Sequence, residues 1–241
     1  MLIDSNNLKD IDVAILAGGL GTRVQEILGD TPKILAPIGG VPFLEYILSG
    51  LARAKAAHVV LCLGHLAEKV KTYIHCSKTK LVKVTAVVEK SPLGTAGAIR
   101  LAAPLLLSET IMIMNGDTWL DIDLEKFVFE HKKSGAGISM ICTEAKDCSQ
   151  FGRVEVNSDG NVTRFVEKDT MFNGAALING GFYLFERSAF DRLIMSTGPS
   201  LEHDFLATDL GTTIHAFVDR HAPFIDIGTP ENLEAANDFF S

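Results

Sequence analysis

Residues 13–23 have the sequence VAILAGGLGTR, an unbroken apolar run that passes directly into a glycine-rich loop. The apolar run predicts a buried strand, because a strand covered on both faces carries apolar side chains at every position. Gly18, Gly19 and Gly21 let the following backbone bend sharply and approach a ligand without hindrance from a Cβ atom. Successive N–H groups in such a loop, and the N-terminus of a helix that we expect to follow it, favour bound anions. This stretch therefore predicts an anion-binding loop at the carboxyl end of a buried strand.

The first half of the chain continues as an alternation of strands and helices. Short apolar, β-branched runs predict strands at 13–16, 59–63, 84–88, 111–114 and 138–142. Amphipathic stretches between them predict helices at 43–55, 66–74, 95–103 and 124–132. This alternation predicts a Rossmann-like α/β fold with a mainly parallel central sheet and helices on both faces. Ligands of such sheets bind beyond the carboxyl ends of the strands.

The pattern changes after Lys133. Residues 153–156 and 162–166 flank the turn sequence NSDG at 157–160, which predicts a hairpin and a small β-rich lobe. The other predicted elements are helices at 188–195 and 201–210, a strand near 224–227 and a closing helix at 230–239. Thr229 is the expected N-cap of the closing helix. The sequence contains no repeat or linker, so we expect a single domain over residues 1–241.

Composition limits the class of protein. The 241 residues carry a formal net charge of −8, which disfavours general binding to a polyphosphate backbone, so we expect no nucleic-acid partner. Hydrophobic residues make up 47% and charged residues 22%, which is enough apolar material for a sizeable core. The four cysteines form no CxxC pair, which favours buried reduced thiols over a zinc site. Because neither a signal peptide nor a bilayer-spanning apolar run is evident, we expect no membrane partner and a cytoplasmic location.

Other glycine motifs explain the loop less well. A Rossmann dinucleotide fingerprint needs a third glycine where Val24 stands, and a Walker loop needs a Gly-Lys pair that the sequence lacks. An ordinary tight strand–helix turn explains the glycines alone equally well. Arg23 and the Pro32-Lys33 step add two cations close after the loop and favour a phosphate ligand.

Two aspartates lie in apolar surroundings. Asp117 ends the run MNGD at 114–117, and Asp226 lies inside the apolar run 224–227. An isolated buried carboxylate is costly unless it is paired or bound to a metal. Mg²⁺ prefers one or two carboxylates together with phosphate oxygens, so the two aspartates are candidate metal ligands. The alternative is that each aspartate caps a following turn or helix. The histidines that fit no ligand spacing, and that we interpret as structural or surface residues, are His65, His131, His203, His215 and His221.

Asp121 and Asp123 imitate the DxD motif of metal-dependent glycosyltransferases. A three-residue motif is weak, and Asp123 immediately precedes a predicted helix, where an aspartate is a good N-cap. A glycosyltransferase that uses these two residues in place of Asp117 and Asp226 stays an alternative function.

Residues 16–23, followed by Pro32-Lys33 and by 36–38, resemble the signature of the sugar-1-phosphate nucleotidyltransferases (nucleotide-sugar pyrophosphorylases). The resemblance runs from Val13 to Asn237. It implies that the loop binds the triphosphate of a nucleoside triphosphate, that Arg23 and Lys33 are the catalytic cations, and that Asp117 and Asp226 hold Mg²⁺. The loop residues implied to bind the nucleotide are Leu16, Ala17, Gly18, Gly19, Gly21 and Thr22. Larger relatives carry a C-terminal β-helix, which this sequence lacks, so we expect no acetyltransfer or regulation through such a domain.

The resemblance also implies a base-binding segment. Glu89, Gly94 and Thr95 match the residues with which the family reads the base, although a helix capped by Thr95 would explain part of this segment. If Glu89 faces the base, its carboxylate can accept from both N1–H and the exocyclic N2–H₂ of guanine, whereas uracil offers one donor on that edge. We therefore expect GTP as the nucleotide.

Three later segments match the sugar side of the family. The residues implied to bind the sugar phosphate are Gly152, Glu167, Lys168, Asn179 and Glu202. Residues 200–206 most resemble the members of the family that guanylylate D-glycero-D-manno-heptose 1-phosphate, with mannose 1-phosphate as the nearest alternative substrate. The implied reaction joins a nucleoside triphosphate and a sugar 1-phosphate to give a nucleotide-sugar for surface polysaccharide synthesis, and pyrophosphate. A catalytically silent sugar-nucleotide-binding protein stays open, as does a homo-oligomer.

Overall fold

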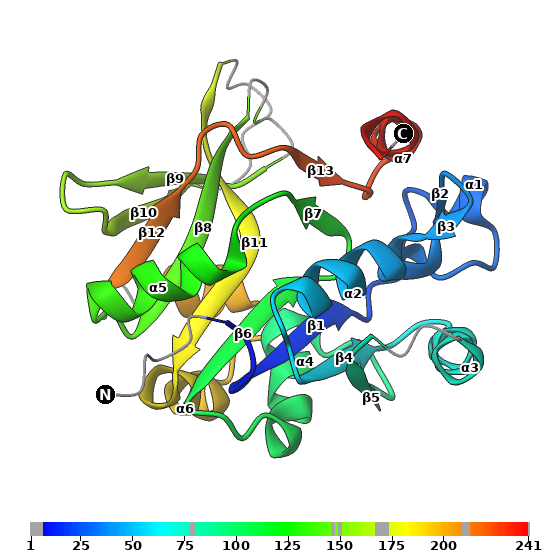
Figure 1. The fold of residues 1–241 in the computed structure, drawn as a ribbon, viewed down its shortest axis with the longest axis horizontal. Coiled ribbons are helices and arrows are strands. Elements are labelled where there is room, and N and C mark those ends of the chain that lie inside the picture. The colour runs from blue at the N-terminus through cyan, green and yellow to red at the C-terminus, as the bar shows by residue number, and fades with distance from the viewer. Residues whose placement is uncertain are drawn as a thin grey trace.

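In the computed structural model, which describes residues 7–77, 81–145, 148, 151–166, 174–208 and 213–240, β1 (Ile11–Ala17) lies at the centre of a nine-stranded sheet (Figure 1). β4 (His58–Leu63) and β6 (Thr110–Asn115) pair with β1 in parallel on either side. β5 (Lys83–Val88) extends the sheet beyond β4 in the same direction. These strands confirm the parallel half of the predicted sheet.

The direction of pairing reverses at β11 (Ala176–Glu186). This strand pairs antiparallel with both β6 and β8 (Ile138–Ala145), and β12 (Ile214–Val218) runs parallel to β8. The predicted hairpin is present as β9 (Arg153–Val156) and β10 (Val162–Val166), and it pairs with β11. The result is a mixed sheet whose second part forms the expected small β-rich lobe.

The sequence analysis predicts no strand at β11 or β12. In β11, Asn179, Gly180 and Gly181 interrupt the apolar pattern with residue types that are uncommon in strands. The register with β8 shifts between Asn179 and Tyr183. Gly181 has a φ of 75°, a backbone conformation that residues other than glycine rarely adopt. The irregularity obscures the strand in the sequence, yet the strand remains paired on both sides of it.

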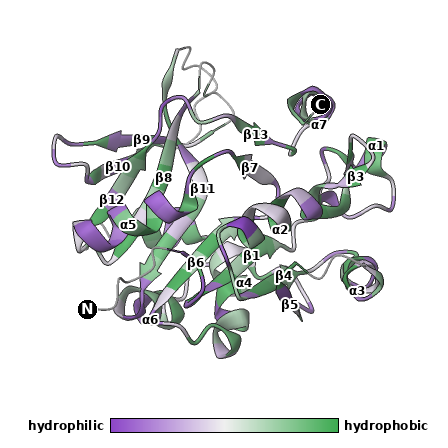
Figure 2. Cartoon of the chain, in the orientation of Figure 1, coloured by the Kyte–Doolittle hydropathy of each residue, from purple (hydrophilic) through white to green (hydrophobic). Residues whose placement is uncertain are grey.

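Helices cover both faces of the sheet, as predicted. One face packs against α2 (Phe43–Arg53), α3 (Ala67–Cys76), α5 (Leu124–Ser134) and α7 (Pro230–Phe239), and the other against α4 (Gly94–Ala102) and α6 (Arg187–Met195). Alternate side chains of β1 serve the two layers, with Val13 and Ile15 in the first core and Ala14 in the second. Figure 2 shows the resulting hydrophobic central strands, with hydrophilic positions on α5 and on the β9–β10 hairpin. The core therefore lies on both faces of the parallel strands. Burial of each large aliphatic side chain in it contributes about 1.5–3 kcal/mol to stability.

The remaining described elements are short. They are α1 (Gln25–Leu28), η1 (Lys33–Leu35), β2 (Pro37–Ile38), β3 (Val41–Pro42), η2 (Ala103–Leu105), β7 (Thr118–Leu120), η3 (Leu201–Leu206) and β13 (Phe224–Asp226). Two of them correct the sequence analysis. The helix expected after the glycine loop is present as α1, but it is a single turn, so its N-terminus adds little to anion binding. The helix predicted at 201–210 is a π-helical segment that ends at Leu206, and residues 209–212 lie outside the described part.

Two predicted helix caps are confirmed. The side chain of Asp123 accepts from the backbone N–H of Lys126 at the start of α5, and Thr229 accepts from that of Asn232 at the start of α7. None of the described helices combines the length and the apolar character needed to cross a membrane.

Candidate active site

The carboxyl ends of the parallel strands meet at one edge of the sheet. Gly116, which follows β6, donates its backbone N–H to the carbonyl oxygen of Leu16 at 2.8 Å. Glu89, which follows β5, donates in the same way to Leu63 at 2.9 Å. The glycine loop leaves β1 at this edge, so the structure brings it next to the segments after β4, β5 and β6, where a ligand is expected.

Two cavities adjoin at this edge. The larger, of about 660 Å³, reaches from the sheet edge to the β9–β10 lobe, and we call it the lobe cavity. The predicted site residues that line it are Arg23, Asp117, Gly152, Asn179, Glu202 and Asp226. The other, of about 310 Å³, lies against the glycine loop, and we call it the loop cavity. The predicted residues that line it are Leu16, Gly18, Gly19, Glu89, Gly94, Thr95, Asp117 and Glu202. Because Asp117 and Glu202 line both, the two cavities meet at these carboxylates.

The other predicted residues lie beside or outside these cavities. Ala17, Gly21 and Lys33 line a small cavity of about 70 Å³, which Asp117 also lines. Thr22 is exposed and lines none of the three cavities. Two further predicted residues, Glu167 and Lys168, lie outside the described residues, so their assignment stays a prediction.

Asp117 and Asp226 lie side by side because β7 and β13 pair. These strands run antiparallel with Asp226 opposite Thr118, and the backbone N–H of Ile227 donates to the carbonyl oxygen of Asp117 at 2.9 Å. Burial and the negative charge of Asp117 raise the pKa of Asp226 above its ordinary value. Two neighbouring carboxylates, of which one resists ionisation, form a donor set that fits a divalent cation. Asp226 also accepts from the N–H of Gly228 at 2.7 Å through Oδ1, so the turn-capping alternative holds for that oxygen.

Two cations accompany the carboxylates. The ammonium group of Lys33 donates to Oδ2 of Asp117 in a direct ion pair. Arg23 lines the lobe cavity together with both aspartates, and the charges of Lys33 and Arg23 oppose the rise in the pKa of Asp226. The Arg23 side chain is exposed, which leaves it accessible to a ligand in the cavity. Two positive and two negative groups thus lie together at the sheet edge, an arrangement that suits a phosphate with a metal ion.

The carboxylate of Glu89 lies where the glycine loop meets the loop cavity. Its Oε2 accepts from the backbone N–H of Leu93 at 3.1 Å. Its Oε1 lies so close to the backbone that a Cβ atom added at Gly18 or at Gly64 would come within 3.0 Å or 2.7 Å of it. An added Cβ atom at Gly64 would also lie 2.6 Å from the backbone oxygen of Gly18, so the close approach of the two segments requires glycine at position 64.

Gly94 and Thr95 contact the segment that precedes η3. Gly94 has a φ of 76°, and an added Cβ atom would lie 2.4 Å from the carbonyl oxygen of Pro199. Thr95 does not cap α4, which begins at Gly94 without a side-chain cap, so that expectation is wrong. Its hydroxyl instead accepts from the N–H of Leu201 at 2.7 Å and donates to Oε2 of Glu202 at 3.2 Å. The hydroxyl is thus engaged by a segment distant in sequence.

Comparison with known proteins identifies the family of this chain. The family model described as nucleotidyl transferase matches residues 13–241. The chain belongs to the nucleotidyl transferase family. Its mixed α/β sheet is the fold of a nucleotidyl transferase, as the sequence resemblance implies.

Members of the nucleotidyl transferase family resemble this chain over nearly its whole length. A D-glycero-alpha-D-manno-heptose 1-phosphate guanylyltransferase of Aneurinibacillus thermoaerophilus is 33% identical over 227 residues, which are 94% of this chain and 96% of that protein. An enzyme of the same name from Campylobacter jejuni is 36% identical over 221 residues, 90% of this chain and 95% of that protein. The crystal structure of HddC from Yersinia pseudotuberculosis complexed with GMP-PN is 31% identical with a TM-score of 0.82, covering 96% of this chain and 100% of that one.

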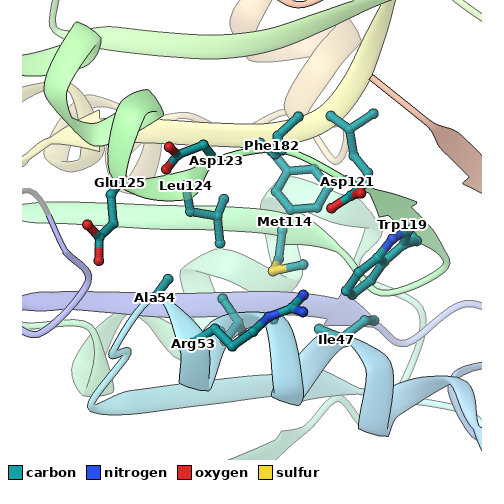
Figure 3. A pocket seen from close by; sticks show the side chains of 14 residues that line it. Ile47, Arg53, Ala54, Met114, Trp119, Asp121, Asp123, Leu124, Glu125 and Phe182 are labelled. Carbon is teal, nitrogen blue, oxygen red and sulfur yellow. The ribbon is translucent and has the colours of Figure 1, made fainter. Parts of the chain in front are cut away.

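The DxD alternative does not fit the geometry of this nucleotidyl transferase. Asp121 and Asp123 line a separate cavity of about 300 Å³ between α2 and the segment that joins β7 to α5 (Figure 3). In Figure 3, Arg53 from α2 lies across this cavity from Asp121 and Asp123. The cavity shares no lining residue with the three cavities at the sheet edge. Because Asp123 also caps α5, the DxD interpretation is wrong for this pair.

Sequence reasoning missed two residues of the site. Tyr183 is fully buried on β11, and its hydroxyl contacts both Asn179 and Glu202. His203, which the sequence analysis assigns to the structural or surface residues, lines the lobe cavity, and its Nδ1 lies 2.9 Å from Oδ1 of Asp204. A buried tyrosine in an apolar strand gives no signal of its own, since it is indistinguishable from a core residue until its partners are known.

Proposed function

We propose that this nucleotidyl transferase moves the GMP group of GTP to D-glycero-D-manno-heptose 1-phosphate and releases pyrophosphate. The observation that carries the proposal is the cluster of Arg23, Lys33 and Asp226 around Asp117, the carboxylate that lines both the loop and the lobe cavities. With the nucleotide in the loop cavity and the sugar phosphate in the lobe cavity, the α-phosphorus and the attacking oxygen meet at the junction of the two cavities. Similarity to the two heptose 1-phosphate guanylyltransferases supports the choice of substrates.

The proposed reaction is an in-line displacement at phosphorus. An oxygen of the sugar 1-phosphate attacks the α-phosphorus, and the bond to the leaving pyrophosphate breaks with its electron pair staying on pyrophosphate. Because no covalent intermediate on the enzyme is required, catalysis consists of positioning and charge neutralisation. Arg23 and Lys33 stabilise the negative charge on the phosphate oxygens. Asp117 and Asp226 would hold Mg²⁺, which when bound supplies a positive charge shared by phosphate oxygens.

The remaining residues of the proposed site recognise the base and the sugar. Glu89 accepts one backbone N–H, but a carboxylate has about four lone-pair sites and can still accept from guanine. A buried acceptor left without its donors costs roughly 1–3 kcal/mol, a preference of about tenfold to a hundredfold for GTP over UTP. The residues that we assign to the sugar phosphate are Gly152, Glu167, Lys168, Asn179 and Glu202. Since GTP is a cytoplasmic metabolite, we place the reaction in the cytoplasm.

Pyrophosphate release from pairs of substrates tests the proposal. ATP, CTP, GTP, UTP and dTTP are each combined with the heptose 1-phosphate and with mannose 1-phosphate, and then mixed in competition. We expect GTP with the heptose 1-phosphate to react fastest. If UTP or CTP outcompetes GTP, the guanine assignment is wrong; if mannose 1-phosphate reacts faster, only the sugar assignment is wrong. No pyrophosphate from any pair would contradict nucleotidyl transfer and favour a silent binding protein.

A further inference from the structure

Glu202 lies where the loop and lobe cavities meet, and hydroxyl groups from two other elements bind its two carboxylate oxygens. The hydroxyl of Thr95, in the first turn of α4, donates to Oε2 at 3.2 Å. The hydroxyl of Tyr183, on β11, donates to Oε1, also at 3.2 Å. One carboxylate therefore connects the segment assigned to the base with the strand that carries Asn179.

At the sugar end of this connection, buried hydrogen bonds fix the orientation of the side chains. Tyr183 has an exposed fraction of 0%, so it cannot contact a substrate. Its hydroxyl accepts from Nδ2 of Asn179 at 2.5 Å, while Oδ1 of Asn179 accepts from the N–H of Gly181 at 2.9 Å. Burial and the negative charge of Glu202 raise the pKa of Tyr183 well above its ordinary value, so the hydroxyl keeps its proton and remains a donor. Both Asn179 and Glu202 are thereby held in one orientation.

The nucleotide-side end is anchored to backbone. Oγ1 of Thr95 accepts from the N–H of Leu201 at 2.7 Å, and the N–H of Ala96 donates to the carbonyl oxygen of Pro199 at 2.9 Å. The segment that carries Glu202 is therefore tied to the start of α4, beside the loop cavity.

We propose that Tyr183 is a positioning residue which, through Glu202, couples the nucleotide site to the sugar site. A base bound against Gly94 and Thr95 stabilises the hydrogen bonds that hold the Thr95 hydroxyl, and with it the Glu202 carboxylate, in the position that contacts the sugar. By linkage, each substrate then strengthens the binding of the other by the same factor. This inference rests on the proposed function, because it assigns one substrate to each cavity.

Tyr183→Phe removes the hydroxyl and keeps the aromatic ring in the core. We expect the KM for the sugar 1-phosphate to rise on the order of tenfold or more, because a hydrogen bond to a charged group is lost. The KM for GTP measured at saturating sugar phosphate should rise less. Calorimetric titration of α,β-methylene GTP, which cannot be turned over, with and without the sugar 1-phosphate measures the coupling factor directly. That factor should fall toward one in the variant.

Tyr73→Phe is the matched control. Tyr73 also donates its hydroxyl to a glutamate, at 2.8 Å to Oε1 of Glu45, but on α3 and away from both cavities. We expect it to leave both KM values and the coupling factor unchanged. Thr95 provides a second test, which stands even if Tyr183→Phe does not fold. Thr95→Ser retains a hydroxyl and should preserve the coupling, whereas Thr95→Val should abolish it.

The outcomes separate this inference from the proposed function. A wild-type coupling factor of one, or a wild-type factor retained in folded Tyr183→Phe, overturns the inference while nucleotidyl transfer stands. If Tyr183→Phe does not fold, a wild-type factor retained in Thr95→Val overturns it. An equal loss of coupling in Thr95→Ser and Thr95→Val shows that packing rather than the hydroxyl matters and also overturns it. A wild-type protein that releases no pyrophosphate from any substrate pair overturns the proposed function, and the coupling with it.

Discussion

The ammonium group of Lys33 forms an ion pair with the carboxylate of Asp117, 84 residues further along the chain. The two side chains are 17% and 30% exposed, so solvent screens their attraction less than it would screen a surface pair. Lys33 thereby neutralises one of the two carboxylates that we assign to the metal. In the proposed reaction Asp117 and Asp226 would hold Mg²⁺, whose charge would neutralise Asp117 and leave the Lys33 ammonium for the phosphates.

Lys33→Ala should lower kcat more than it raises the KM for GTP, because the released ammonium acts mainly on charge that develops in the transition state. We expect a loss on the order of a hundredfold in kcat, measured by steady-state pyrophosphate release. Lys71→Ala is the control, since Lys71 is an exposed residue of α3 that pairs with Glu68 at 2.9 Å, and it should retain full activity. A rise in the KM for GTP alone would show that Lys33 only binds the ground state.

Asp117→Asn and Asp226→Asn should each depress turnover strongly, because each removes one charge from the carboxylate pair that we assign to Mg²⁺. Chelation of metal by EDTA should abolish pyrophosphate release by the wild-type protein, and added Mg²⁺ should restore it. Titration calorimetry with Mg²⁺ measures the loss of metal binding in each variant. Full activity of the wild-type protein in EDTA, or full activity of both variants, would contradict the assignment of Asp117 and Asp226 to the metal.

Asp226→Asn should also raise the thermal transition at neutral pH in metal-free buffer. Burial and the charge of Asp117 raise the pKa of Asp226 above its ordinary 3.8. A carboxyl group whose pKa rises on folding stabilises the fold below its ordinary pKa, and this contribution is lost as the pH rises through the raised pKa. At neutral pH the wild-type protein has lost it, whereas the neutral amide is insensitive to pH. Thermal scans from about pH 4 to pH 7 should show the gain in Tm growing with pH.

Asp12→Asn provides a control of opposite sign for those scans. Burial would raise the pKa of Asp12, but hydrogen bonds from His58, Ser108 and Leu107 outweigh it and lower that pKa. A lowered carboxyl pKa stabilises the fold above the ordinary value and is lost as the pH falls through the lowered one. Asp12→Asn should therefore lower Tm at neutral pH. Equal shifts in the two variants would contradict the assignment.

The fold should weaken as the pH falls from about 7.5 to about 5.5, in part through His131. This buried side chain lies 2.7 Å from Oγ of Ser139 and 2.9 Å from Oε1 of Glu186. Burial lowers its pKa, against the opposing charge of Glu186. Between the ordinary pKa of 6.5 and the lowered pKa, the unfolded chain binds more protons than the folded chain. The free energy of unfolding therefore decreases as the pH falls through this range.

Urea unfolding at the two pH values measures this dependence, and His131→Gln should reduce it. His75→Gln, on the exposed surface of α3, should leave it as in the wild type. A dependence that is identical in wild type and His131→Gln would contradict the role of His131.

Gly94→Ala should lower Tm and raise the KM for GTP. The added methyl group would lie 2.4 Å from the carbonyl oxygen of Pro199, which forces the segment before η3 away from α4. Gly135→Ala is a matched control, since Gly135 has a similar φ of 65° but an added Cβ atom there meets nothing within 4 Å. Both variants bear the cost of a positive φ, roughly 1–2 kcal/mol. Comparable Tm losses and an unchanged KM in both would refute the packing role of Gly94.

Much of the parallel half of the fold is predictable from sequence. β1, β4 and β6 are apolar over nearly their whole length, and a short continuous apolar run indicates a strand that is buried on both faces. β11 gives no such indication, because Gly180 and Gly181 interrupt its pattern, and its place between β6 and β8 depends on pairing with strands distant in the chain. Long-range pairing compensates for poor local strand propensity, and no local pattern records it.

The site divides in the same way between local sequence and tertiary structure. The sequence alone predicts the glycine loop, the cations that follow it and the caps at Asp123 and Thr229, because backbone conformation and capping depend on near neighbours. Only the folded chain decided that Asp226 lies beside Asp117, and that the hydroxyl of Thr95 binds Glu202, 107 residues away, instead of capping α4. The partner of a polar side chain is set by whichever distant segment packs against it, and that packing is a property of the assembled sheet and its helices.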